Sequence, residues 1–123
     1  MKVKISSFIL FLFIITIACK HEIINPTGSQ LSFKTDVLSI FTSNCTFSGC
    51  HNTSSASNGY IFTNYTTITS KEIKPGNATG SKVYKVLLET DLNKRMPRPP
   101  YNALNSTQIA LIKKWIDEGA LNN

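Results

Sequence analysis

Two cysteines and a histidine stand close together in the stretch Cys45-Thr-Phe-Ser-Gly-Cys50-His51. Thiols can pair as a disulfide, bind a metal ion or form thioethers, and imidazole is a common metal ligand. A disulfide between Cys45 and Cys50 would close a loop of six residues. A tetrahedral zinc site would need a fourth ligand, and the only other histidine, His21, stands near the N-terminus. In a third use, both sulfurs would hold a metal-containing group whose metal binds His51, and all three uses are open on these residues alone.

Met96 is the only methionine after the initiator, and it lies in the segment Lys94-Arg-Met-Pro-Arg-Pro-Pro100. A single methionine often fills space in a core. Here three prolines restrict the backbone φ, and the residue before a proline favours an extended conformation. The segment is therefore predicted to be a stiff loop, on which a thioether loses little conformational entropy when it binds a metal. Met96 is the candidate for a second metal ligand.

Short helices are expected to position these residues. Apolar residues at helical spacing predict helices over residues 36–44, directly before the cysteine segment, and over residues 81–89. A polar run over residues 52–58 predicts a surface loop, and Pro75-Gly-Asn77 predicts a turn. Residues 60–68 fit either an extended segment or a single helical turn. The chain is thus predicted to be mainly helical, with long loops.

The strongest helix signal lies near the C-terminus. Asn105 and Gln108 form a capping-box pattern, in which each side chain accepts a hydrogen bond from the backbone N–H of the other residue. Gly119 suits the position that follows a helix. Trp115 is expected to anchor this helix by packing. The apolar stripe that would face the core consists of Ile109, Ile112, Trp115 and Ile116.

Composition limits the class of protein. A chain of 123 residues and 13.6 kDa has room for one domain. With 41% hydrophobic and 16% charged residues, it is neither a disordered chain nor a membrane protein with several spans. Thirteen Lys and Arg against seven Asp and Glu give a net charge of +6. The net charge is +4 without Lys2 and Lys4, which lie in the export signal predicted below. These charges form no dense basic stripe, so no nucleic-acid partner is predicted.

The N-terminus has the features of an export signal. A basic start precedes an apolar run, which predicts a signal peptide over residues 1–18. This run is shorter than the roughly 20 residues that span a bilayer comfortably. The sequence Thr16-Ile-Ala-Cys19 resembles a bacterial lipobox and predicts lipidation of Cys19, with a flexible tether over residues 19–30. The protein is then exported and lipid-anchored in the cell envelope, on the periplasmic side of the inner or outer membrane; an ordinary signal peptide is the alternative.

The cysteine segment resembles a c-type haem attachment site, usually written C-x-x-C-H, but four residues separate its cysteines instead of two. Three further stretches, over residues 74–81, 94–100 and 115–120, follow it in a characteristic order and spacing. Together with the predicted first helix, they resemble the small class I cytochrome c domains of exported bacterial proteins. The resemblance covers about residues 31–121.

This resemblance implies an all-α, cytochrome c-like fold over residues 31–123, with three to four short helices around one covalently attached haem c and with long loops. The first and last helices would pack together beside the haem. Cys45 and Cys50 would form the thioethers, His51 would be the proximal iron ligand and Met96 the distal one. The protein would then be a monohaem carrier of single electrons outside the cytoplasmic membrane, and not an enzyme.

Two other functions stay open, both for a lipoprotein with this fold: a haem-free module for protein interactions, and a module that binds or senses a small ligand. An electron carrier needs redox partner proteins, and the basic excess between Lys71 and Arg98 favours acidic ones. Arg95 or Arg98 is expected to pair with a haem propionate. The candidates to line the haem pocket are Tyr60, Phe62 and Tyr65, and a place in the ordinary core is the equal alternative for each of them.

Overall fold

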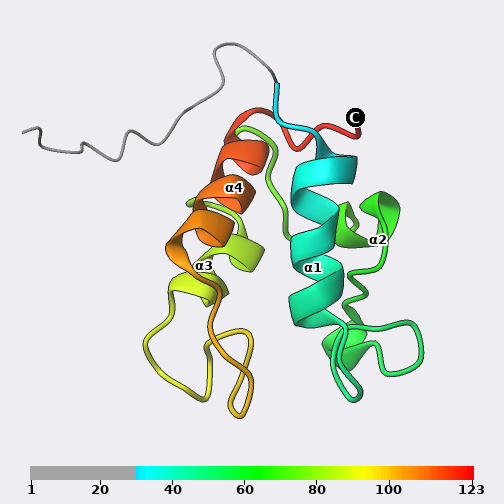
Figure 1. Ribbon diagram of the computed structural model, residues 1–123, viewed down its shortest axis with the longest axis vertical. Helices are drawn as coiled ribbons and strands as arrows, with labels where there is room; N and C mark the ends of the chain where they lie inside the picture. The colour runs from blue at the N-terminus through cyan, green and yellow to red at the C-terminus, as the bar shows by residue number, and fades with distance from the viewer. Residues whose placement is uncertain (1–29) are drawn as a thin grey trace, which may run out of the picture.

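A computed structural model describes residues 30–123 (Figure 1). This part of the chain is all-helical and contains no strand, as predicted. The predicted signal peptide over residues 1–18, the predicted lipidation site Cys19 and all but the last residue of the tether over residues 19–30 lie outside the described residues. Within residues 30–123, no helix has the length and apolar character that crossing a membrane requires.

The first helical segment begins three residues before the predicted start at residue 36. A π-helical segment, η1 (Phe33–Val37), continues directly into α1 (Leu38–Cys45). Ser32 caps this start, since its Oγ accepts a hydrogen bond from the N–H of Thr35 at 3.3 Å. The N–H of Ser32 donates to the Asp36 carboxylate at 2.9 Å. The helix ends at the first cysteine of the attachment-like segment, so a rigid element carries this thiol.

The helices of the C-terminal half lie close to where the sequence predicts them. Ser81 precedes α3 (Lys82–Leu88), and Asn105 precedes α4 (Ser106–Asp117). The predicted capping box is present: the N–H of Gln108 donates to Asn105 Oδ1 at 2.9 Å, and the N–H of Asn105 donates to Gln108 Oε1 at 3.0 Å. These two bonds satisfy N–H groups that have no partner within the helix.

Gly119 ends α4 as predicted, with a φ of +102° that favours glycine. Its N–H donates to the carbonyl of Ile116 at 3.0 Å, and the N–H of Ala120 donates to the carbonyl of Trp115 at 2.8 Å. This pair of bonds is the Schellman motif, which satisfies the last carbonyls of a helix. The chain therefore turns sharply and returns along the helix end.

Two short elements lie between α1 and α3. The polar run that predicts a loop ends in a single 3-10 turn, η2 (Ser57–Gly59). The segment over residues 60–68, for which two conformations were open, contains one helical turn, α2 (Tyr65–Thr69). Asn64 caps α2, because its side chain accepts a hydrogen bond from the N–H of Thr67 at 3.0 Å.

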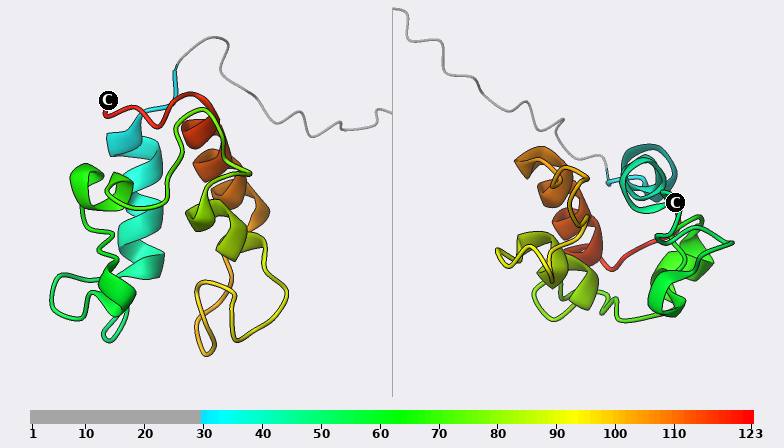
Figure 2. Two further views of the ribbon diagram at one scale, coloured as in Figure 1. Left: turned by 180° about the vertical axis from the view of Figure 1, so that it is seen from behind. Right: turned by 90° about the horizontal axis from the view of Figure 1, so that it is seen from below.

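Trp115 joins the two sides of the molecule. In Figures 1 and 2, α1 and α2 lie on one side and α3 and α4 on the other. Trp115 is 1% exposed, and its ring centroid lies 5.1 Å from that of Phe33 and 6.2 Å from that of Phe41. Its Nε1 donates to the carbonyl of Leu121 at 2.9 Å. The first and last helices thus pack together, and Trp115 is the expected packing anchor.

The described chain begins and ends at the same end of the helices. The side-chain amide of Asn123 donates to the carbonyl of Leu31 at 3.0 Å and accepts from the N–H of Phe33 at 2.8 Å. The backbone carbonyl of Asn123 accepts from the N–H of Lys34 at 3.0 Å. We call these hydrogen bonds the Asn123 clamp. Figure 1 shows that the two chain ends joined by the clamp lie at the end opposite to the long loops over residues 46–56 and 89–104.

Candidate functional site

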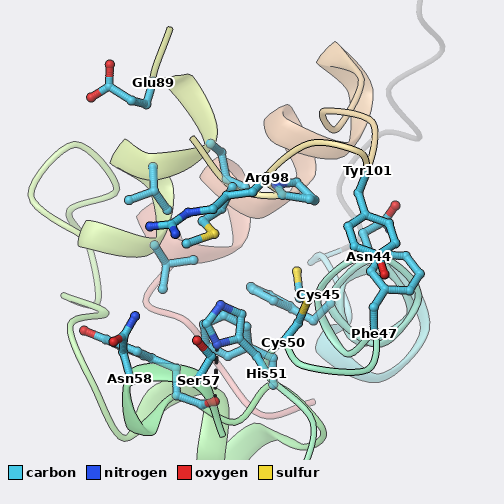
Figure 3. A pocket seen from close by; sticks show the side chains of 18 of the residues that line it. Asn44, Cys45, Phe47, Cys50, His51, Ser57, Asn58, Glu89, Arg98 and Tyr101 are labelled. Atoms are coloured by element: carbon cyan, nitrogen blue, oxygen red, sulfur yellow. Dashed lines mark hydrogen bonds between the residues drawn. The ribbon is translucent and has the colours of Figure 1, made fainter. Parts of the chain in front are cut away.

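A cavity of about 620 Å³ lies between the two sides of the molecule, lined by residues of α1, α3, α4 and the long loops. Its volume is in the range of small-molecule and cofactor sites. All four residues predicted to bind a group line this cavity: Cys45, Cys50, His51 and Met96. Figure 3 shows the two cysteines and the histidine beside one another on one wall. The fold therefore brings together two sequence segments that the prediction linked only by chemistry.

The segment between the cysteines is a hydrogen-bonded loop. The N–H of Cys50 donates to the carbonyl of Phe47 at 2.9 Å, and the N–H of His51 donates to the carbonyl of Cys45 at 3.0 Å. The side-chain amide of Asn52 donates to the carbonyl of Phe47 at 2.9 Å. Its Oδ1 accepts from two N–H groups of the next turn, at 2.9 and 2.8 Å. The four residues between the cysteines are thus part of a loop that the Asn52 side chain stabilises by hydrogen bonds.

A backbone carbonyl orients the imidazole of His51. The residue is 9% exposed, and its Nδ1 lies 3.3 Å from the carbonyl oxygen of Tyr60. Because a carbonyl only accepts hydrogen bonds, this contact places the proton on Nδ1 and leaves a lone pair on Nε2. Burial lowers the pKa of His51, and the opposing backbone contacts of Tyr60 and Ser57 are weaker. The ring is therefore favoured in the neutral form that can bind a metal through Nε2.

Both cysteines of the cavity have free thiols. Burial, and to a lesser degree the charge of Cys50, raise the pKa of the Cys45 thiol to about 12. Cys45 is therefore held as the neutral thiol at neutral pH. In the part of the chain from residue 30 onward, no three His, Cys, Asp or Glu side chains gather where they could hold a metal ion.

Met96 reaches the cavity from the loop that follows α3. Its backbone N–H donates to the carbonyl of Val86 in α3 at 2.9 Å. The turn before it is closed by Lys94 and Arg95, whose N–H groups both donate to the carbonyl of Asp91, at 2.9 and 2.8 Å. The loop is thus fastened to a helix at the residue that carries the thioether.

Charged residues stand among apolar ones in the cavity lining. Lys82, Lys94 and Arg98 outnumber the single acidic residue, Glu89. Arg98 makes no ion pair within the described residues, and Figure 3 shows its side chain extended along the cavity. Arg95 does not line the cavity, and its Nε donates to the carbonyl of Pro97 at 3.3 Å. The apolar lining includes Phe41, Phe62, Val83, Val86, Leu87 and Ile112.

Two of the three aromatic residues expected to line the pocket do so. Tyr60 and Phe62 face the cavity, and the ring of Phe62 lies 4.7 Å from that of His51. Tyr65 does not line the cavity and takes the alternative place, in the core. Its ring packs edge-on against Phe33 with centroids 5.2 Å apart, and its hydroxyl donates to the carbonyl of Ala120 at 2.8 Å. Tyr65 therefore belongs to the core at the opposite end of the fold.

Sequence reasoning missed an aromatic pair at the cavity. The rings of Phe47 and Tyr101 are stacked, with centroids 4.1 Å apart and planes 3° from parallel. Both residues line the cavity. The available signal was that Phe47 is the one aromatic residue between the two cysteines.

Comparisons of the chain with protein-family models, with curated proteins and with solved structures find no match. The residues and geometry of the cavity are therefore the basis on which a function is assigned.

Proposed function

We propose that the protein is a monohaem c-type cytochrome that carries single electrons outside the cytoplasmic membrane. One observation carries the proposal: two thiols, an oriented imidazole and a thioether line a single cavity with apolar walls. Haem c uses these donor types, since two sulfurs bond the porphyrin edge while an imidazole and a thioether bind the iron. The residues in these roles are Cys45, Cys50, His51 and Met96.

The residues of the cavity fit haem c. Cys45 and Cys50 lie on the wall that also carries His51, so the group held by their sulfurs is presented to the imidazole. The carbonyl of Tyr60 holds the proton on Nδ1 and keeps the Nε2 lone pair for the iron. Met96 enters from a different loop. When bound, the haem supplies an iron that takes up and releases one electron, and His/Met ligation raises its potential.

The arrangement of the helices supports a cytochrome c-like fold. α1 ends at the first thioether cysteine, and α4 packs against the segment that precedes α1 through Trp115 and Phe33. The cavity lies beside this packed pair, and residues of the long loops contribute to its lining. An electron carrier of this kind converts no substrate, and we assign the protein no enzymatic activity.

The proposed function includes export and a lipid anchor at Cys19. The thioether bonds of haem c are made outside the cytoplasm, which agrees with the predicted signal over residues 1–18. The partners are redox proteins, and the lysines and arginine at the cavity favour acidic ones. A lipid on Cys19 would keep the carrier beside membrane-bound partners.

Covalent attachment tests the proposal directly. The chain, produced with a c-type maturation system, is expected to retain haem after denaturation, and Cys45→Ser/Cys50→Ser is expected to lose it. Staining of the denatured protein for haem, together with its mass, measures this. Cys19→Ser is the matched control, since it also removes a cysteine but should keep the haem while losing the lipid.

The same preparations separate the other two functions. A wild-type chain that carries no haem under these conditions would contradict the proposal and favour a haem-free interaction module. A haem-loaded chain with high-spin iron that binds added ligands at once would favour a ligand-binding module. Low-spin iron with a sulfur-to-iron charge-transfer band is the result expected for the electron carrier.

Arg98 is expected to raise the midpoint potential. A positive charge at the cavity favours the reduced iron, so Arg98→Gln should lower the potential by on the order of 10 to 50 mV. Arg95→Gln is the matched control and should leave the potential almost unchanged, because Arg95 does not line the cavity. Spectroscopic redox titration of both variants measures the effect. If the midpoint potential of Arg98→Gln equals that of Arg95→Gln, Arg98 is not the residue that pairs with a haem propionate.

A further inference from the structure

The stack between Phe47 and Tyr101 links the two loops that carry the proposed iron ligands. Phe47 lies between Cys45 and Cys50, and Tyr101 lies five residues after Met96. Their rings are 4.1 Å apart and nearly parallel, at 3°. Stacked aromatic rings attract one another beyond the effect of the area they bury. The contact therefore joins the loop between Cys45 and Cys50 to the loop that carries Met96 across the cavity. We call the second of these the methionine loop.

The position of Phe47 is set by its own loop. Its carbonyl accepts hydrogen bonds from the N–H of Cys50 and from the side-chain amide of Asn52, both at 2.9 Å. Gly49, at a φ of +79°, turns the chain back toward Cys50, and its N–H donates to Ser55 Oγ at 3.0 Å. The backbone of Phe47 is thus held on a hydrogen-bonded loop, so little backbone ordering is needed for its ring to meet a partner.

The position of Tyr101 is set in the same way on the other loop. Its N–H donates to the carbonyl of Arg98 at 3.0 Å, and two prolines precede it directly. Tyr101 is 37% exposed, so it is not a core residue held in place by burial on all sides. Packing of the core therefore does not account for the parallel stacking of this ring on Phe47.

We propose that Phe47 and Tyr101 form a latch that keeps the methionine loop closed over the cavity and so favours Met96 as an iron ligand. Both are positioning residues, since they act through the loop that carries the thioether. This inference rests on the proposed function and adds a use for the wide cysteine spacing. The residues that separate Cys45 from Cys50 supply the aromatic side chain that reaches Tyr101.

The latch acts on an equilibrium between a closed loop with Met96 on the iron and an open loop with an accessible iron. Loss of one stacked pair shifts this equilibrium toward the open loop by roughly 2- to 10-fold. An external ligand binds the open form, so its apparent affinity rises by the same factor as long as the closed form dominates. Access of a small ligand to the iron therefore reports on the latch.

Imidazole titration of the haem-loaded ferric full-length chain tests this inference. Phe47→Ala and Tyr101→Ala are each expected to bind imidazole about 2- to 10-fold more tightly than the wild type. The double variant should bind it no more tightly than the stronger single variant, because either change removes the whole stack. Tyr101→Phe keeps the ring and should match the wild type. Loss of the charge-transfer band and the shift of the haem absorption give the affinities.

A second measurement excludes a general loss of stability. The urea midpoint of each variant is compared with that of Leu92→Ala. Leu92 is 54% exposed and lies between α3 and α4, as Tyr101 does. Leu92→Ala should bind imidazole as the wild type does. Should Phe47→Ala reduce haem attachment, Tyr101→Ala still tests the latch, since it leaves the cysteine loop unchanged.

The possible failures are distinguishable. A wild-type chain without covalent haem would overturn the proposed function and the latch together. A haem-loaded wild type whose Tyr101→Ala variant binds imidazole with unchanged affinity would overturn the latch alone. Additive effects of the two single changes would also overturn it, because they would show that the rings act independently.

Discussion

Replacing Met96 by alanine is expected to abolish the sulfur-to-iron charge-transfer band of the haem-loaded protein. The midpoint potential should fall by on the order of 100 mV, because a thioether ligand stabilises Fe(II) relative to stronger donors or water. The loop itself should persist, since the N–H of Met96 donates to the carbonyl of Val86 and this bond does not depend on the side chain. Optical spectra and redox titration measure both effects.

Thr90→Ala is the control for this experiment. Thr90 is exposed, lies between α3 and α4 as Met96 does, and does not line the cavity. Both the charge-transfer band and the midpoint potential should therefore be those of the wild type. Persistence of the band in the alanine variant of Met96 would show that another group binds the iron. In that case the assignment of the distal ligand is wrong, whereas covalent attachment through the cysteines is unaffected.

Replacing Trp115 by alanine is expected to lower the free energy of unfolding by about 3–5 kcal/mol, the range for a large buried aromatic residue. The change removes the contacts with Phe33 and Phe41 and the hydrogen bond to the Leu121 carbonyl. Small domains have a total stability of about 5–15 kcal/mol, so the loss is a large fraction of the total. Urea unfolding followed by circular dichroism measures it.

Trp115→Phe should cost less, because it keeps an aromatic ring and loses mainly the hydrogen bond. The folded fraction of either variant should retain the haem spectrum of the wild type, since Trp115 does not line the cavity. A loss below about 1 kcal/mol in the alanine variant would contradict the packing role. An altered haem spectrum in the folded protein would place this residue against the haem instead.

Local hydrogen bonding explains which elements could be predicted from the sequence. The capping box of Asn105 and the glycine at the end of α4 each involve residues a few positions apart, so their types alone identify them. The turn at Pro75-Gly-Asn77 is of the same kind, closed by a bond from the N–H of Asn77 to the carbonyl of Lys74 at 2.9 Å. The first helix begins earlier than predicted, because Ser32 caps it and Phe33, four residues before Val37, extends its buried face.

The residues of the site could be predicted from their chemistry, but the contacts between distant segments could not. The chemistry of Cys45, Cys50, His51 and Met96 suggested one site, and the structure places all four around one cavity. Tyr65 has the same composition cues as Tyr60, but its hydroxyl pairs with a carbonyl 55 residues away, which no local pattern indicates. The stack on Tyr101 likewise joins two loops whose relative position is decided only by the packing of the helices.

The clamp formed by Asn123 has a consequence for the reach of the molecule. It brings the first described residues to the pole of the domain that is farthest from the methionine loop. If Cys19 carries a lipid, the eleven residues from Lys20 to Gln30 connect it to that pole, and a chain of eleven residues can span at most about 40 Å. The point of attachment would then lie opposite the methionine loop, which leaves the cavity side of the domain for contact with partner proteins. Because the tether is predicted to be flexible, such a carrier could meet membrane-bound partners as well as those that diffuse past.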